Sequence, residues 1–158
     1  MQKRYARRTG IYRSGLEDKI SKQLEAKNIK YAYEEWKVPY VVPASKHTYT
    51  PDFILDNGII IEAKGLWEAD DRKKHMLLKD QHPDLDIRFV FSSARTKIYK
   101  GSRTSYAEFC EKHNIKFAEG TIPLEWLKEP KKSIDYSKLK RGTKKWVNAK
   151  HIGLKKML

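Results

Sequence analysis

The chain has 158 residues and a formal net charge of +14, a length that suits one domain with a real core, and its mean hydropathy of -0.78 predicts a soluble protein. No apolar run approaches the length that spans a membrane, and the first residues lack the apolar region of a secretory signal. The single cysteine, Cys110, excludes an internal disulfide and is consistent with a reducing cytoplasm, and the five histidines lack the close spacing of zinc ligands.

The positive charge is concentrated at the two ends of the chain. Residues 1–13 carry +5 and residues 128–158 carry +9, which leaves residues 14–127 neutral overall. A neutral body with basic arms is typical of a protein that follows a polyanion such as DNA. The alternative is tails that improve solubility or adhere to ribosomes. The residues of the first arm that we expect on DNA are Arg4, Arg7, Arg8 and Arg13.

A helix is predicted to begin at Ser14. The run SGLE has the spacing of a capping box, in which a serine hydroxyl and a glutamate carboxylate three residues later close the first turn. Leu16, Ile20 and Leu24 then follow at the intervals of one helical face. From these residues alone, Glu17 is interpreted as a helix cap.

The segment from Tyr31 to Val42 has the aromatic and β-branched content of strands. Pro39 and Pro43 interrupt this segment, and because proline cannot donate to a sheet ladder, the sequence excludes a long central strand here.

Residues 50–64, TPDFILDNGIIIEAK, contain the pattern on which the site prediction depends. Two apolar runs flank a turn signal that ends at Gly58, which predicts a β-hairpin. A two-residue loop would pair Asp52 with Ala63 and place the carboxylates of Asp52 and Glu62 on opposite faces. A three-residue loop with Gly58 in the left-handed conformation pairs Asp52 with Glu62 instead, and we predict this register.

This register would bring two carboxylates together with Lys64, which lies two residues along on the same face. Directly opposed residues in a hairpin have Cβ atoms roughly 4.5–5.5 Å apart. Carboxylates that close repel each other unless a cation lies between them, and oxygen ligands suit Mg²⁺. A lysine beside such a metal can orient a water, which indicates a metal-assisted phosphodiester hydrolase with the PD…(D/E)xK nuclease signature. The alternative is a surface hairpin whose polar residues face water.

Three further elements are predicted along the chain. Asp70 to Gln81 has the pattern of a helix, and Asp86 to Phe91 that of a strand. Ile122 to Leu127 is expected to pack as a short turn anchored by Trp126.

A basic stretch separates the last two of these elements. Ser92 to Ala107 contains no acid and includes Tyr99 and Tyr106, so we interpret it as a DNA-facing loop that enters a helix at about Thr104 to His113. The alternative is a solvated basic loop. The basic side chains expected on DNA are Arg95, Lys97, Lys100 and Arg103.

Longer stretches of the chain resemble a known family, the phage endonuclease I family of the T-seven type, whose members are Holliday-junction resolvases. The resemblance covers about Ser14 to Lys132 and fades over residues 133–158. The stretches that carry it are SGLEDK at 14–19, YEEWKVPYVVPAS at 33–45, HTYTPDF at 47–53, KGLWEADDRKKH at 64–75 and PDLDIRFVFSS at 83–93.

The resemblance implies an α/β fold of the PD-(D/E)xK restriction-endonuclease-like type, with a mixed sheet and flanking helices. It implies an intertwined, domain-swapped homodimer bridged by residues 31–49. A basic arm at 1–13 and a basic tail at 131–158 would flank a nuclease domain at 14–130.

The active-site residues that the resemblance implies are Glu17, Asp52, Glu62 and Lys64. Asp52 and Glu62 would hold one Mg²⁺ with the carbonyl of Ala63, and Asp52 and Glu17 a second. Mn²⁺ is expected to substitute. In the implied dimer, Glu17 comes from one chain and the other residues come from its partner.

The implied reaction is Mg²⁺-dependent hydrolysis of phosphodiesters in branched DNA, above all four-way junctions, leaving 5′-phosphates. It needs no organic cofactor and no membrane, and a phage enzyme would act in the cytoplasm of a bacterial host. Three alternatives stay open: an endonuclease that cuts linear duplex DNA, a non-catalytic DNA-binding protein with basic arms, and an RNA-binding protein with the same tails.

Overall fold

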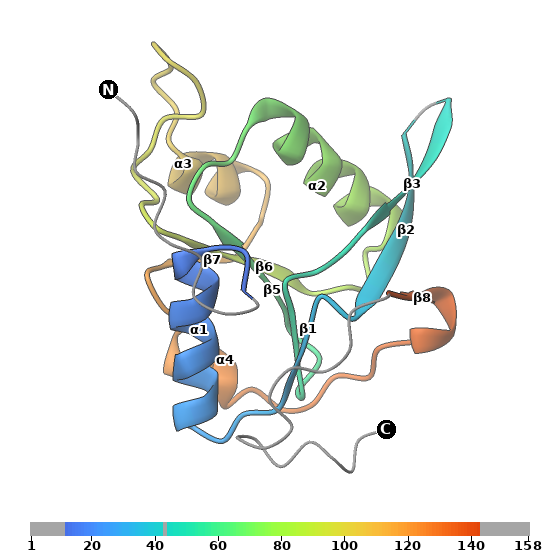
Figure 1. The fold of residues 1–158 in the computed structure, drawn as a ribbon. Coiled ribbons are helices and arrows are strands. Elements are labelled where there is room, and N and C mark those ends of the chain that lie inside the picture. Colours follow the sequence, from blue (N-terminus) through green and yellow to red (C-terminus); the bar gives the residue numbers. More distant parts are fainter. Residues whose placement is uncertain (1–11, 43, 143–158) are drawn as a thin grey trace.

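A computed structural model describes residues 12–42 and 44–142 (Figure 1). Arg4, Arg7 and Arg8 therefore lie outside the described residues. The helices are α1 (Gly15–Ala26), α2 (Ala69–Gln81), α3 (Tyr106–Lys112), α4 (Leu124–Leu127) and the 3₁₀ helix η1 (Tyr136–Lys138). The strands are β1 (Tyr31–Tyr33), β2 (Trp36–Val42), β3 (Ser45–Tyr49), β4 (Phe53–Leu55), β5 (Ile60–Lys64), β6 (Ile87–Phe91), β7 (Phe117–Glu119) and β8 (Lys140–Arg141).

A mixed sheet of five strands, ordered β1-β4-β5-β6-β7, organises the described part of the chain. In this sheet β4 pairs antiparallel with both β1 and β5, whereas β6 pairs parallel with both β5 and β7. A second sheet has three strands in the order β3-β2-β8. The predicted mixed α/β sheet with flanking helices is thus confirmed, while exchange of a segment between two chains stays a prediction.

Alternating side chains of the larger sheet pack against helices on its two faces. Ile20 and Leu24 of α1 pack with Phe53 of β4 and Val90 of β6 in one core cluster. The flanking Phe89 and Phe91 of β6 belong to another cluster, which includes side chains of α3. This separation follows from the period of two along a strand, and it places α1 apart from α3 as Figure 1 shows.

The other predicted elements are found within two residues of their expected ends. The expected helix at 70–81 is α2, the expected strand at 86–91 is β6, and the helix after the basic stretch is α3. The prediction that Tyr106 belongs to a DNA-facing loop is wrong, because Tyr106 begins α3 and is buried in its core cluster. Trp126 does pack against the main core. Within the described residues, no helix is both long enough and apolar enough to cross a membrane.

The expectation that the prolines exclude a long central strand is wrong for β2. It runs for seven residues and includes Pro39, although we expected no long strand there. Trp36 and Lys37 are the residues of β2 that pair with β8, and beyond them no strand of the described residues pairs with this edge of β2. At that edge the Pro39 carbonyl accepts a hydrogen bond from the His82 side chain, and Gln81 bonds the backbone of Val41. Proline is tolerated because, in the part of the chain that the structure describes, no strand at this edge needs its missing N–H.

The hairpin of β4 and β5 has the predicted three-residue loop. Phe53 pairs with Ile61 and Ile54 with Ile60, and the next pair in this register is Asp52 with Glu62. Gly58 closes the loop with a φ of +87°, in the left-handed region that glycine adopts without strain. The register prediction is therefore confirmed.

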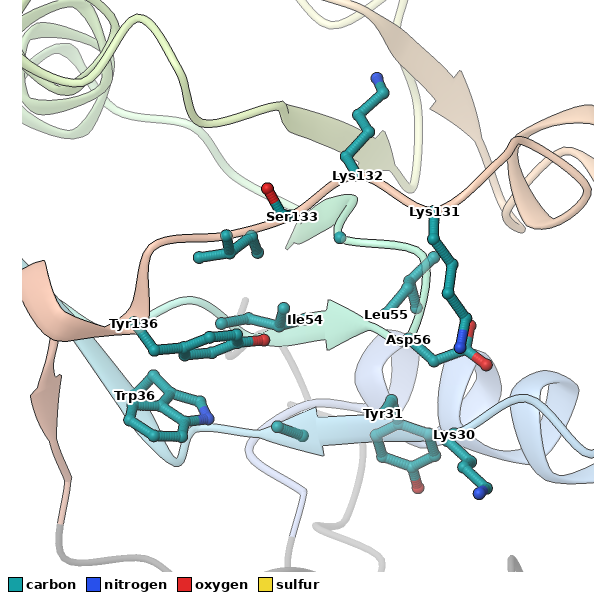
Figure 2. Close-up of a pocket in the computed structure, with 13 residues that line it drawn as sticks. Lys30, Tyr31, Trp36, Ile54, Leu55, Asp56, Lys131, Lys132, Ser133 and Tyr136 are labelled. Atoms are coloured by element: carbon teal, nitrogen blue, oxygen red, sulfur yellow. The ribbon is translucent and has the colours of Figure 1, made fainter. Parts of the chain in front are cut away.

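A strap formed by residues 131–136 crosses this hairpin (Figure 2). The Lys132 N–H donates to the Asn57 carbonyl at 2.8 Å, and Tyr136 packs on Trp36 with ring centroids 4.7 Å apart. A cavity of about 590 Å³ lies between the strap and strands β1 and β4. These contacts hold the first part of the predicted basic tail against the domain.

The close approach of the strap generates a prediction for Gly58. A Cβ placed on Gly58 would lie 2.5 Å from the Lys132 carbonyl oxygen, whereas one on Gly101, with φ of +88°, would meet nothing within 4 Å. Gly101→Ala therefore should cost only the backbone strain, about 1 kcal/mol, and Gly58→Ala should cost at least about 2 kcal/mol. Urea unfolding of both variants measures the difference, and equal costs would contradict the contact with the strap.

Candidate active site

A cleft of about 470 Å³ opens beside the N-terminus of α1, the start of β4 and the end of β5. One chain brings all the predicted catalytic residues to this cleft, so a second chain is not needed for them to meet. The lining residues are Arg13, Ser14, Glu17, Thr48, Tyr49, Thr50, Asp52, Glu62, Ala63, Lys64 and Lys74.

The hairpin supplies two buried carboxylates, Asp52 at 6% and Glu62 at 3% exposure. Asp52 Oδ2 accepts a hydrogen bond from the Ala63 N–H at 2.9 Å. Glu62 Oε2 accepts from the Tyr49 hydroxyl, and Glu62 Oε1 lies 3.2 Å from Lys64 Nζ. Each carboxylate is therefore held by its own donors within the lining of the cleft.

Glu17 comes to the cleft from the first turn of α1. The Ser14 hydroxyl accepts from the Glu17 N–H at 3.1 Å, so the first half of the predicted capping box is present. The Glu17 carboxylate does not return to Ser14. It accepts from the Arg13 N–H at 2.8 Å and from the Tyr33 hydroxyl at 2.5 Å. The interpretation of Glu17 as only a helix cap is therefore wrong, because its side chain lies among the acidic residues of the cleft.

A third carboxylate, Glu34, joins Glu17 and Asp52. One oxygen atom from each of these residues lies within 4.8 Å of the other two, and all three side chains are buried. Glu34 follows β1 with a φ of +47°, and its backbone N–H donates to the Asp52 carbonyl at 3.2 Å. Glu34 was not predicted from the sequence, although two adjacent acids in a strand-rich segment were a signal for it.

The chemistry of this acidic cluster fits a hard divalent cation. The cluster offers carboxylate oxygens and no sulfur or imidazole ligand, which is the donor set that Mg²⁺ and Mn²⁺ prefer. Glu17, Glu34 and Asp52 could therefore hold a metal ion. Glu62 is not one of these three, and its oxygens face Tyr49 and Lys64.

The electrostatics of the cleft also favour a cation. Burial raises the pKa of Asp52 well above its usual value, and the charges of Glu62 and Glu17 raise it further. Burial likewise raises the pKa of Glu62, against the opposing effect of Lys64. Both shifts mean that negative charge is costly here without a positive partner, so a bound cation would stabilise the ionised carboxylates.

Lys64 is held between two acids. Its Nζ lies 3.2 Å from Glu62 and 2.5 Å from Asp71 Oδ2, and the other oxygen of Asp71 lies 2.5 Å from Lys74. Burial alone would lower the pKa of Lys64, but the charges of Glu62 and Asp71 outweigh burial and raise the pKa above its usual value. Lys64 is therefore a cation at neutral pH. Asp71, which the first turn of α2 brings beside Lys64, was not predicted as a site residue from the sequence.

The basic loop begins at the C-terminal end of β6, next to Lys64 at the C-terminal end of β5. Strands β5 and β6 run parallel with Lys64 opposite Phe91, so the loop that follows β6 starts beside the end of β5. The predicted DNA-binding residues of this loop are all exposed: Arg95, Lys97, Lys100 and Arg103. Their role stays a prediction, and Arg13, the one described member of the N-terminal set, lies at the cleft itself.

Comparison with known proteins identifies close relatives. Residues 1–146 match the family model described as phage endonuclease I. Endonuclease I of Escherichia phage T7 is 71% identical over 140 residues, which are 88% of this chain and 94% of that protein. Endodeoxyribonuclease 1 of Enterobacteria phage T3 is 63% identical over 136 residues, which are 85% of this chain and 90% of that protein.

The crowding of carboxylates generates a prediction for Asp52. In EDTA, Asp52→Asn should raise the unfolding free energy by about 1 kcal/mol, because it removes a buried charge near Glu17 and can keep the bond to Ala63. Mg²⁺ should stabilise the unchanged protein and leave the variant almost unaffected. Thermal unfolding with EDTA and with Mg²⁺ measures both effects, and the exposed Asp84→Asn is the control. Equal stabilisation of Asp52→Asn by Mg²⁺ would show that the ion binds elsewhere.

Proposed function

Because the chain belongs to the phage endonuclease I family, we propose that it is a Mg²⁺-dependent endonuclease that resolves four-way DNA junctions. The observation that carries the proposal is one cleft that contains Glu17, Asp52, Glu62 and Lys64. Three carboxylates can hold metal ions, and a lysine beside them can orient a water, which suits metal-assisted hydrolysis of a phosphodiester.

We assign the two metal positions to residues of this cleft. Asp52, Glu62 and the carbonyl of Ala63 would hold one Mg²⁺, and Asp52 with Glu17 the second, with Mn²⁺ as a substitute. Glu34 lies close enough to both Glu17 and Asp52 to join the second set. When bound, the ions would supply positive charge to the phosphate and lower the pKa of a water molecule.

The remaining chemistry falls to residues of the chain. Lys64, placed by Glu62 and Asp71, donates a hydrogen bond that orients the attacking water. The water oxygen joins the phosphorus, the bond to the 3′-oxygen breaks, and a proton ends on that oxygen. The products are a 5′-phosphate and a 3′-hydroxyl. No organic cofactor enters this reaction.

The charge distribution supports DNA as the substrate. The exposed basic loop begins beside Lys64, where β5 ends, so a duplex bound along the loop would pass the cleft. The basic ends of the chain, which carry +5 and +9, would add contacts to phosphates. Because both relatives are phage proteins, we propose that the chain acts in the cytoplasm of a bacterial host.

We further propose that two copies form an intertwined homodimer. Two symmetric cuts across a four-way junction need two sites related by a two-fold axis. The predicted bridge, residues 31–49, connects α1, which carries Glu17, to the hairpin of β4 and β5. If this connection crossed to a partner, the contacts between α1 and the hairpin would be kept. Each site would then combine Glu17 of one chain with Asp52, Glu62 and Lys64 of the other.

The direct test is cleavage of a four-way junction against a linear duplex that contains the same sequences. We expect rapid cutting of the junction in Mg²⁺, little cutting of the duplex, and none of either in EDTA. Equal cutting of both would support an endonuclease of linear duplex DNA, and binding without cutting would support a non-catalytic protein. Structured RNA as a competitor separates the RNA-binding alternative.

Variants of the hairpin test the assignment of residues. Glu62→Gln and Lys64→Ala should each lower single-turnover cleavage by at least about a thousandfold and leave junction affinity within a few fold, because these residues serve the chemistry. The matched controls are Glu125→Gln and Lys112→Ala, which change exposed side chains outside the cleft and outside the two basic ends. Near-normal cleavage by either hairpin variant would contradict the assignment.

Mixed dimers test the sharing of the site. We would co-fold a Glu17→Ala chain with a Glu62→Ala chain and purify the heterodimer. If Glu17 serves the partner, one site carries both changes and the other carries neither, so the heterodimer should nick the junction once. Complete loss of nicking in a verified heterodimer would place Glu17 in the same site as Glu62 of its own chain.

A further inference from the structure

Arg13 lies at the cleft and not merely in a basic arm. It lines the cleft together with the four proposed catalytic residues. Its backbone N–H donates to Glu17 Oε2 at 2.8 Å and also reaches the Tyr33 hydroxyl at 3.1 Å. These two bonds fix its Cα beside the acidic cluster, whatever its side chain does.

The guanidinium of Arg13 remains accessible. Its Nη1 lies 3.3 Å from Glu34 Oε1, and 64% of the side chain is exposed. An arginine presents five N–H donors in a planar fork, so one contact with Glu34 leaves most donors for a further anion. Glu34 itself is 5% exposed, so the ion pair holds the guanidinium at the surface of the cluster.

Arg13 offers an entering phosphate an accessible positive charge, which the two lysines of the cleft offer less. A phosphate that enters the cleft approaches the carboxylates of Glu17, Glu34 and Asp52. Lys64 and Lys74 also line the cleft, but their side chains are 18% and 27% exposed and both are ion-paired with Asp71. Among the described residues that line the cleft, Arg13 is the most exposed cation.

We propose that the Arg13 guanidinium contacts the phosphate that is cut and positions it over the acidic cluster. A planar fork can donate two parallel hydrogen bonds to the oxygens of one phosphate. The Glu34 carboxylate restrains the guanidinium from the opposite side. This inference rests on the proposed nuclease function and deepens it, because it gives one residue of the arm a place at the reacting group.

A thermodynamic cycle on junction binding tests the contact. Wild type and Arg13→Ala are titrated in EDTA with a junction that carries a normal or a neutral methylphosphonate linkage at the cut position. Loss of the arginine alone, or of the phosphate charge alone, should weaken binding about tenfold to a hundredfold. The two changes together should weaken binding little further than one of them, because both remove the same interaction.

Matched controls separate this contact from general attraction. Arg95→Ala removes an exposed arginine of the basic loop, and its effect should multiply with that of the methylphosphonate. Arg13→Lys, which retains the charge without the fork, should recover part of the affinity and show the same lack of additivity. Thermal unfolding of Arg13→Ala shows whether loss of the Glu34 partner disturbs the fold, and Arg13→Lys replaces it in the cycle if so.

The outcomes distinguish this inference from the proposed function. If the effects of Arg13→Ala and methylphosphonate multiply while wild type cuts the junction in Mg²⁺, the contact with the cut phosphate is overturned and the nuclease assignment stands. If wild type fails to cut, the proposed function falls and the inference falls with it. Effects that do not add, with a wild type that cuts, support both.

Discussion

The left-handed conformation of Gly58 is the constraint on which the site depends. With φ at +87°, it closes a three-residue loop and sets Phe53 opposite Ile61. A slip of one residue would turn every side chain of one strand to the other face and separate Asp52 from Glu62. The strap at Lys132 packs so closely on Gly58 that no larger residue fits, so the end of the domain holds the loop in the conformation that the site requires.

The buried carboxylates of the acidic cleft lower the stability of the fold. Burial and mutual repulsion raise the pKa of Asp52, and a buried carboxylate near others is a cost that a hydrophobic core would not carry. The cluster is tolerated because donors surround it: the Ala63 N–H, the Tyr33 hydroxyl and the Arg13 backbone each bond one carboxylate. A site of this kind favours a cation, which is the property that metal-assisted hydrolysis uses.

Local patterns predicted the parts of the molecule that depend on local interactions. The turn chemistry at Gly58 gave the hairpin and its register, because loop length alone fixes which residues pair. Glu34 and Asp71 were not predicted because they come from other elements, and only the packing of those elements brings Glu34 near Asp52 and Asp71 near Lys64. Tyr106 was misplaced because a tyrosine in a basic stretch suits either DNA or a core. Pro39 sits in a strand because its neighbour on that edge is a helix end.

Crystals grown with Mn²⁺ would test the central claim that the hairpin carboxylates form a metal site. Anomalous scattering locates the ion directly. We expect an ion bound to Asp52, with a carboxylate oxygen of this residue at roughly 2.0–2.2 Å, and with Glu17 or Glu62 as a further ligand. A fully occupied Mn²⁺ site elsewhere, with no ion in contact with Asp52 at saturating Mn²⁺, would contradict the account.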